Sequence, residues 1–390
     1  MKSLPSFIFL YVIMLNFSLT VTSLNQRCID IIDAIERKSD LVLCPIIDDP
    51  KRKDNLGEYL TGANMILINF TCEISDTALC DKIKSAFETA GSTISAAFNF
   101  RAQIIIDARF KNLNNKNVLG STVPTRLMFL DSEDDVTRLY PQALVKQFQF
   151  TNHSQYADSD ITSIFNSAFN YWFEGDPPIK QNQYDFYTIA VHEIFHGLGF
   201  YSLWGNYFGF NNKTIDALTP YPLLSGMSSS DPLYFNGFVE SIFDKFLMIY
   251  DSTTSSIISS TNITSELNTF GPPGTKFSSL TDFSDKFKAS SQWETVAKYF
   301  YRMATMAESM KFVPRGVDFI SGTFLETSIP FFPGSSICHV SNADYSGTSD
   351  FLMRYVVESG VTGTNLTARG GSYSGGVIGP HLREIMSSLG

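Results

Sequence analysis

Asp185–Ser202 reads DFYTIAVHEIFHGLGFYS, and this stretch decides the fold expected for the rest of the chain. It contains the pattern H-E-x-x-H, formed by His192, Glu193 and His196. Residues four apart on a helix lie on the same face, so the two imidazoles can hold one metal ion, and the glutamate between them can act on a water molecule at that ion. Apolar residues at helical spacing, an aspartate suited to the N-cap and glycines near the end predict a helix here.

A catalytic zinc ion needs a third protein ligand, because its fourth position stays open to water. The other histidines are His153, His339 and His381. His153 lies in the glycosylation sequon N-H-S, which indicates a wet surface, and His381 follows Gly-Pro at the start of the last helix-like stretch. His339 lies in PGSSICHVSNADYSGTSDFLMRY, and this context makes it the candidate. If His339 were not a ligand, a downstream carboxylate such as Glu240 would take its place.

These segments resemble the metzincin zinc proteases of the leishmanolysin-like kind, over about residues 65–390. In metzincins the pattern continues as H-E-x-x-H-x-x-G-x-x-H. Here Gly199 is in place, but Ser202 stands where the third histidine is expected. In leishmanolysin-like members an insertion displaces that histidine downstream, and a methionine turn follows it. His339 matches the displaced histidine, and Met353 in DFLM matches the turn. The run HGLGF is also similar to that of a group of microbial secreted zincins.

The resemblance implies a fold and a metal. The fold is α+β, a zincin-like catalytic domain with a mixed twisted sheet, an active-site helix and a mostly helical lower subdomain. The metal is one catalytic Zn²⁺ bound by His192, His196 and His339. Met353 would form an apolar floor beneath the metal and would not be a ligand.

The resemblance also implies roles for two further residues. Glu193 would be the general base. Tyr355 matches a tyrosine that in some metzincins swings toward the zinc and stabilises the transition state, although a packed tyrosine is commoner. The chain departs from the pattern at its long insertion, at Cys338 beside the third ligand and at Arg354 after the methionine. These departures bear on substrate preference more than on the metal.

The N-terminus has the features of a secretory signal peptide over residues 1–23, with a short basic start, an apolar run and small residues before the cleavage site. The apolar run is too short to be a good membrane span, and no later run reaches membrane length. The net charge of −10 argues against a nucleic-acid partner. We therefore expect a secreted, extracellular monomer without a membrane span that acts on protein or peptide substrates.

Sequons and cysteines agree with an extracellular protein. Five sequons follow the signal peptide, at Asn69, Asn152, Asn212, Asn262 and Asn365, which suits a glycoprotein. Pairing of neighbouring cysteines would give the disulfides Cys28–Cys44 and Cys72–Cys80 and leave Cys338 as a buried thiol, but connectivity does not follow from sequence alone.

The chain divides into segments by composition and pattern. After the signal peptide we expect an N-terminal extension or removable pro-segment (24–60), an upper subdomain that ends in the metal helix (61–200), a largely helical insertion (201–335), and a final segment with the third ligand, the methionine turn and a closing helix (336–390).

Hydrophobic periodicity predicts several elements within these segments. A strand, a long helix and a strand over residues 65–110 predict a βαβ opening. Residues 160–173 are expected to form an edge strand above the metal, or alternatively an ordinary core strand. Helices are expected to start at Asp231-Pro232 and at Ser291, and a closing helix is expected over 377–389.

The function expected from these features is that of a secreted zinc endopeptidase. One alternative is a catalytically silent binding or adhesion glycoprotein on the same scaffold, against which the intact Glu193 argues. The other is a structural metal site closed by a fourth protein ligand, with Cys338 as the candidate.

Overall fold

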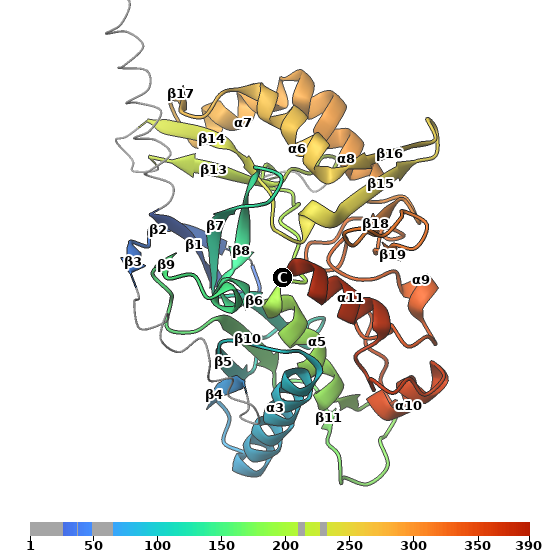
Figure 1. Ribbon diagram of the computed structural model, residues 1–390. Helices are drawn as coiled ribbons and strands as arrows, with labels where there is room; N and C mark the ends of the chain where they lie inside the picture. Colours follow the sequence, from blue (N-terminus) through green and yellow to red (C-terminus); the bar gives the residue numbers. More distant parts are fainter. Residues whose placement is uncertain (1–25, 37, 49–64, 210–214, 227–231) are drawn as a thin grey trace, which may run out of the picture.

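The computed structural model describes residues 26–36, 38–48, 65–209, 215–226 and 232–390, drawn in colour in Figure 1. The signal peptide expected over 1–23 and the sequon at Asn212 lie outside the described residues. The described part is an α+β structure, as predicted, and it contains several sheets. None of its helices is long and apolar enough to cross a membrane.

A four-stranded sheet with the order β4-β5-β10-β6 carries the helix that contains the H-E-x-x-H pattern. Its strands are β4 (Ile66–Cys72), β5 (Ile104–Lys111), β6 (Gly120–Pro124) and β10 (Ile161–Asn166). β4, β5 and β10 run parallel, and β6 pairs antiparallel with β10 at the edge. Alternate residues of β5 are fully buried, because successive side chains of a strand point to opposite faces.

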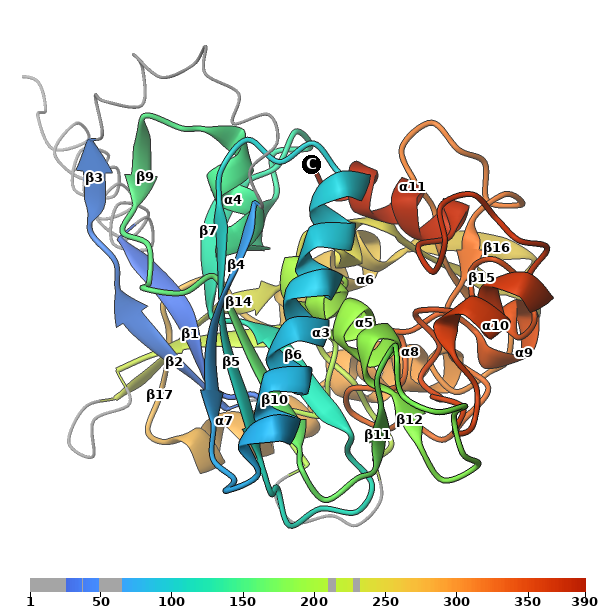
Figure 2. The ribbon, with the colours of Figure 1, turned by 90° about the horizontal axis from the view of Figure 1, so that it is seen from below.

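Two helices, α3 (Thr77–Ala97) and α5 (Phe186–Leu198), lie side by side on one face of this sheet (Figure 2). α3 begins after Asp76, whose carboxylate accepts a hydrogen bond from the backbone N–H of Leu79. The Cys72–Cys80 disulfide joins the end of β4 to the start of α3. The βαβ opening predicted from periodicity is therefore confirmed, with its parallel strand pair.

Of the two interpretations of residues 160–173, the edge strand is wrong and the ordinary core strand is confirmed. β10 pairs with β5 on one side and with β6 on the other, so it is an interior strand and β6 forms the edge. Sequence periodicity could not reveal this, because the pairing of β10 with the earlier strand β6 is non-local. The rest of the expected strand forms β11 (Tyr171–Trp172), which pairs with β12 (Tyr184–Asp185).

The N-terminal segment belongs to a second four-stranded sheet, with the order β2-β1-β7-β8. Its strands are β1 (Arg27–Asp33), β2 (Lys38–Leu43), β7 (Arg126–Asp131) and β8 (Thr137–Pro141). The predicted Cys28–Cys44 disulfide closes this hairpin. Beyond it, β3 (Ile46–Asp48) pairs with β9 (Asn152–Ser154). The described residues of the expected extension are thus paired with strands of the upper subdomain.

The expectation of a largely helical insertion is wrong, because residues 201–335 contain two small sheets as well as helices. Two small sheets have the orders β13-β14-β17 and β16-β15-β18-β19. The strands are β13 (Tyr221–Ser225), β14 (Leu233–Val239), β15 (Leu247–Asp251), β16 (Ser256–Ser259), β17 (Thr275–Phe277), β18 (Met310–Phe312) and β19 (Thr323–Phe324). The helices are α6 (Ser260–Leu267), α7 (Leu280–Lys288) and α8 (Lys298–Met303), with the one-turn elements η2 (Asp244–Phe246) and η3 (Asn268–Phe270) and the π-helical η4 (Gln292–Ala297).

The helix expected from Asp231-Pro232 onward is therefore wrong, because the described part of that stretch forms β14 and the start of β15. Its phenylalanines fit a helical period, but β14 pairs with both β13 and β17, and Gly237 at φ +112° interrupts its pattern. Tertiary pairing overrides the local pattern here. The helix expected from Ser291 is present as η4 and α8.

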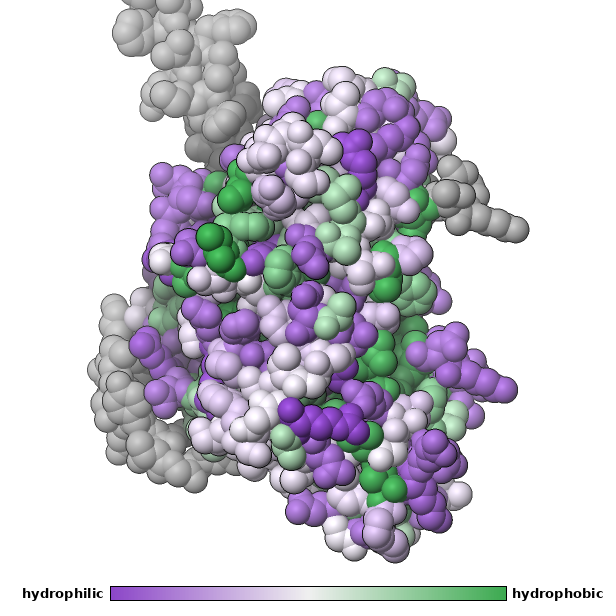
Figure 3. All heavy atoms as spheres, turned by 90° about the vertical axis from the view of Figure 1, so that its right-hand side faces the viewer, coloured by the Kyte–Doolittle hydropathy of each residue, from purple (hydrophilic) through white to green (hydrophobic). Residues whose placement is uncertain are grey.

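Short helices and the surface complete the fold. Short helices are α4 (Gln142–Val145), η1 (Lys146–Phe148), α9 (Asn342–Tyr345), α10 (Gly363–Arg369) and the closing helix α11 (Pro380–Leu389). On the face seen in Figure 3, apolar residues appear as separate groups among polar ones, which is usual for a surface in contact with water. The four described sequon asparagines are all exposed.

Candidate metal centre

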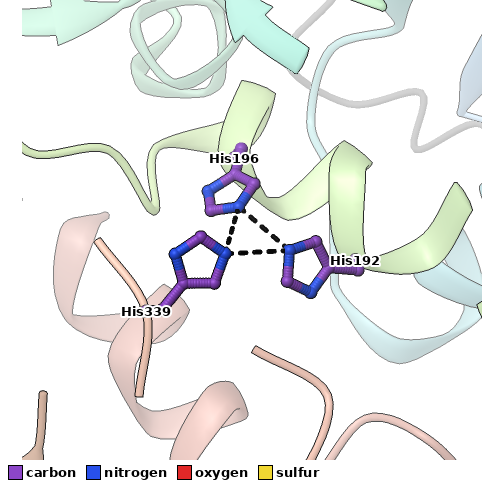
Figure 4. Close-up of side chains that lie close together, drawn as sticks. All are labelled: His192, His196 and His339. Carbon is purple, nitrogen blue, oxygen red and sulfur yellow. Dashed lines mark hydrogen bonds between the residues drawn. The ribbon is translucent and has the colours of Figure 1, made fainter. Parts of the chain in front are cut away.

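The three predicted ligands meet at one point, although they come from two distant parts of the chain (Figure 4). The Nε2 atoms of His192 and His196 on α5 lie 3.1 Å apart. Nε2 of His339 lies 3.1 Å from the first and 3.2 Å from the second. All three side chains are buried.

The opposite ring nitrogens fix how these imidazoles are protonated. Nδ1 of His192 lies 2.6 Å from the carbonyl oxygen of Leu352, and Nδ1 of His196 lies 2.8 Å from that of Phe200. Nδ1 of His339 lies 3.0 Å from the carbonyl oxygen of Ser335. A carbonyl oxygen only accepts, so each Nδ1 carries the proton and donates. Each Nε2 then presents a lone pair toward the other two.

This arrangement fits a metal ion. Three acceptor nitrogens in mutual contact cannot hydrogen-bond one another, whereas a cation between them would interact with all three lone pairs. Two nitrogen ligands on one tetrahedral zinc ion are about 3.3 Å apart, close to the separations found here. Backbone carbonyls on Nδ1 are the usual outer partners of ligating histidines. Burial also lowers the pKa of His192 to about 4, which keeps its imidazole neutral as a ligand requires.

Helix α5 holds its two histidines through close packing. The helix is buried along almost its whole length, and it ends at Gly199, whose φ of +126° favours glycine. A Cβ atom on Gly197 would lie 2.4 Å from Cγ2 of Ile161 on β10. Glycine is therefore required for the helix to lie this close to the sheet.

His339 lies in a loop, and a buried glutamate holds that loop in place. The backbone N–H of Glu326 donates to the carbonyl of His339 at 2.8 Å, and that of Ile337 donates to the carbonyl of Glu326 at 3.0 Å. The fully buried carboxylate of Glu326 accepts hydrogen bonds from the backbone N–H groups of Ser328 and Asn342 and from the Ser328 hydroxyl. It thereby links the chain on both sides of His339.

Met353 lies in a tight turn that adjoins the metal centre. The turn is closed by the N–H of Arg354, which donates to the carbonyl of Phe351. The carbonyl of Met353 accepts a hydrogen bond from the N–H of Val340, next to the third histidine, at 2.8 Å. The Met353 side chain is buried in the apolar core. The same turn supplies the Leu352 carbonyl described above.

Arg354, one of the departures from the metzincin pattern, anchors this turn. It is buried, and its guanidinium donates to the side chains of Asn342, Ser346 and Glu358. The arginine thus ties the turn to α9, just after the third histidine.

The predicted catalytic residues lie on the same two segments. Glu193 is buried on α5, and its charge is close enough to contribute to the raised pKa of Tyr171, for which burial is the main cause. Tyr355 is half-buried and follows Arg354 directly after the turn.

Cys338 does not face the three Nε2 atoms. Its sulfur lies 3.8 Å from Nδ1 of His339, the ring nitrogen that points away from the cluster. The metal-binding group found among the described residues consists of the three histidines, so the thiol is not part of it. Cys338 is buried and lies outside both disulfides, as predicted.

Ser202, at the usual third-ligand position, has a different partner. Its side chain hydrogen-bonds the buried carboxylate of Asp244. The same carboxylate accepts from the N–H groups of Leu203 and Ser241. Burial, with the nearby Glu240 charge, raises the pKa of Asp244 to about 7. The exit of α5 is therefore held by Asp244.

The other candidates lie elsewhere. Glu240 accepts from the hydroxyls of Ser260 and Thr264 and is not in the cluster. His153 is buried and stacks on Tyr156, so the predicted wet surface holds only for its exposed neighbour Asn152. His381 is partly exposed beside Asp350.

Sequence reasoning missed Glu326 and Asp244, the two buried acids that hold the two parts of the metal centre. Neither belongs to a local motif, and only their hydrogen-bond partners distant in sequence identify them.

A family model described as SPBPB7E8-like matches residues 50–390. Uncharacterized protein PB7E8.01 of Schizosaccharomyces pombe is 28% identical over 363 residues, which cover 84% of this chain and 62% of that protein. The chain thus spans less than two thirds of that relative's length. No solved structure matches this chain.

Proposed function

The chain belongs to the SPBPB7E8-like family, and we propose that it is a secreted, zinc-dependent endopeptidase of the metzincin kind. The observation that carries the proposal is the meeting of three buried Nε2 atoms from His192, His196 and His339, with Glu193 next to the first of them on the same helix. Two disulfides and exposed sequon asparagines support an extracellular location.

The histidines would hold Zn²⁺ and leave one coordination position open. Zinc held by these histidines would supply Lewis-acid chemistry, because it lowers the pKa of water and polarises the substrate carbonyl. Glu193 takes a proton from water as the water oxygen attacks the carbonyl carbon of the peptide. It then gives that proton to the leaving amine as the C–N bond breaks, so the products are a carboxylic acid and an amine, which become a carboxylate and an ammonium group when the second water proton passes to the amine.

Two further residues have supporting roles in this proposal. Met353 gives an apolar floor and is not a ligand. The Tyr355 hydroxyl would donate a hydrogen bond to the carbonyl oxygen as negative charge develops there. The three outer carbonyls of Leu352, Phe200 and Ser335 keep the imidazoles oriented and their Nδ1 protons in place.

The position of Cys338 disfavours a closed structural metal site. A fourth protein ligand would have to approach the Nε2 side of the cluster, whereas the Cys338 sulfur is near Nδ1 of His339. A three-histidine set is the arrangement of a catalytic zinc site.

The test compares casein hydrolysis and zinc content in the wild type, Glu193→Gln and Glu174→Gln, with Glu174 chosen because it is exposed. We expect about one zinc per chain in all three, and a loss of about 10²–10⁴-fold in rate for Glu193→Gln alone. A wild-type rate for Glu193→Gln would overturn the assignment of the base. Bound zinc without hydrolysis of any substrate in the wild type would favour a silent binding glycoprotein.

A further inference from the structure

A cavity of about 340 Å³ lies where three segments distant in sequence meet. One wall comes from the N-terminal strands β1 and β2, another from the residues that follow α5, and the third from the loop that precedes His339. Figure 1 shows the N-terminal strands in blue on the left of the molecule, next to β7.

Two segments that position the metal ligands also line the cavity. The carbonyl of Phe200 orients His196, and the cavity wall begins at the next residue, Tyr201. The carbonyl of Ser335 orients His339, and both Ser336 and Cys338 line the cavity. A group bound in the cavity would therefore contact the two segments that position two of the three ligands.

The lining is mainly apolar and aromatic, with neutral polar side chains among it. Aliphatic side chains form part of it, including Ile29, Ile31, Leu127 and Leu203, and aromatic rings form another part, including Tyr201, Trp204, Tyr221 and Phe331. Small neutral polar side chains also line it, namely Ser39, Ser202, Asn206 and Ser336. Of the described lining residues, Glu36 is the charged one, and it is exposed at the rim. Such a lining favours a neutral, bulky apolar group and disfavours a charged one, because a buried charge would lack a partner. The volume is at the small end of ligand sites, enough for a side chain.

The N-terminal wall of the cavity is firmly attached. β1 pairs with β7, and the carboxylate of Asp30 accepts two hydrogen bonds from the Arg126 guanidinium, at 2.6 and 2.8 Å. Ile29 and Ile31 belong to a core cluster that also contains Tyr201 and Leu203, the residues after α5. The β1–β2 hairpin is thus packed against the residues that follow α5, next to the metal centre.

We propose that this cavity receives a bulky apolar or aromatic side chain of the peptide that the metal centre cleaves. The proposal rests on the proposed endopeptidase function. It makes β1 and β2 part of the substrate site, so residues 27–43 stay in the active enzyme and are not removed with a pro-segment. The substrate class is a protein or peptide with a large apolar residue near the scissile bond.

Ser39→Trp on β2 is the variant that tests the cavity. Ser39 is half-buried at the cavity, where its hydroxyl lies 3.1 Å from that of Tyr221, so an indole there would occupy the space. Leu43→Trp is the matched control, because Leu43 lies on the same strand, is exposed and does not line the cavity. A second pair of variants introduces a charge. Ile35→Asp places the charge at the rim of the cavity, and its control Ile32→Asp places the charge away from the cavity.

The first measurement is cleavage of peptides that differ only in one residue near the scissile bond, with Phe, Leu, Ala, Asp or Lys at each position in turn. We expect one position where kcat/KM for Phe or Leu exceeds that for Ala by about tenfold or more. Ser39→Trp and Ile35→Asp should reduce this ratio to about one, and both controls should keep the ratio. An unchanged ratio in Ser39→Trp, or no apolar preference at any position, would overturn the proposal and leave the endopeptidase function standing.

A second measurement separates failure of the cavity from failure of the function. Saturation-transfer NMR detects binding of N-acetylphenylalanine amide, with N-acetylaspartate amide as the charged comparison. Binding of the phenylalanine amide to the wild type and Leu43→Trp, but not to Ser39→Trp, supports the cavity as an apolar side-chain site even if no peptide is cleaved. If no peptide is cleaved, equal binding to all three proteins, or binding to none, would overturn it.

Discussion

The metal centre has a helical part and a loop part, which place their histidines equally closely by different means. His192 and His196 are four residues apart on α5, so the helix itself places both Nε2 atoms on one face. His339 comes 143 residues after His196 and lies in a loop, yet its Nε2 atom is as close to each of them as they are to each other. The helical part is specified by local spacing. The loop part depends on partners that are distant in sequence.

A buried carboxylate supports each part. Asp244 accepts hydrogen bonds from Leu203 and Ser241 just beyond the end of α5. Glu326 accepts from Ser328 and Asn342 around the loop of His339. We expect the loop to depend on its carboxylate far more than the helix does, because α5 is also held by its own hydrogen bonds and by packing on the sheet.

The largest expected effect comes from removal of a ligand. His192→Ala, His196→Ala and His339→Ala should each lose zinc affinity by more than the about 10–100-fold that is typical of an outer partner. The losses should be similar for the helical and loop histidines, because each supplies one of three equivalent nitrogens. Zinc titration against a competing chelator measures this, with His381→Ala as the control outside the cluster. If His339→Ala kept wild-type affinity, the loop part of the account would be wrong.

The next effect separates the loop from the helix. Glu326→Gln keeps the size of the side chain but replaces one acceptor oxygen by an N–H donor group, so one of its N–H partners loses its hydrogen bond. We expect a loss of about 10–100-fold in zinc affinity, because the loop no longer holds His339 in one position. The same chelator titration measures it.

Glu266→Gln is the matched control for that variant, since Glu266 is exposed. Circular dichroism should show unchanged helix content in Glu326→Gln. Wild-type zinc affinity in Glu326→Gln would show that the loop is positioned without its carboxylate.

The smallest effect on the metal is expected from Asp244→Asn, which should leave zinc affinity almost unchanged and alter the pH dependence of stability. The pKa of Asp244 is raised from 3.8 to about 7, first by burial and then by the Glu240 charge. The native state therefore holds this proton where the unfolded chain has lost it. The stabilising contribution is complete below about pH 3.8 and is lost as the pH rises through about 7.

An asparagine cannot ionise, so the variant should escape that loss. The free energy of unfolding of Asp244→Asn, relative to the wild type, should increase as the pH rises from about 4 to about 7. Urea denaturation at several pH values, with a chelator present throughout, measures the difference. Parallel profiles for the two proteins would contradict the raised pKa.

Sequence reasoning succeeded where local spacing carries the information. The helices α3 and α5 were predicted from hydrophobic periodicity, and both disulfides join cysteines that are close in sequence. His339 was identified through its context and the methionine turn, and the structure brings it to the other two histidines.

The prediction failed where non-local pairing decides the structure. Phenylalanines in residues 233–247 recur with a helical period, but the chain forms β14 and then turns into β15. One of the two expectations placed β10 at the edge of its sheet, and it is enclosed because the earlier strand β6 pairs along its other side. Glu326 was missed for the same reason, since its partners are known only from the fold.

The most direct test of the central claim is X-ray absorption spectroscopy at the zinc edge on the zinc-loaded wild-type protein. The account predicts about one zinc per chain with three imidazole nitrogens and one further light atom, all at about 2.0–2.1 Å. It also predicts that His339→Ala loses one imidazole from this set. A sulfur ligand at about 2.3 Å, which would place Cys338 on the metal, or an imidazole count that does not change in His339→Ala, would contradict it.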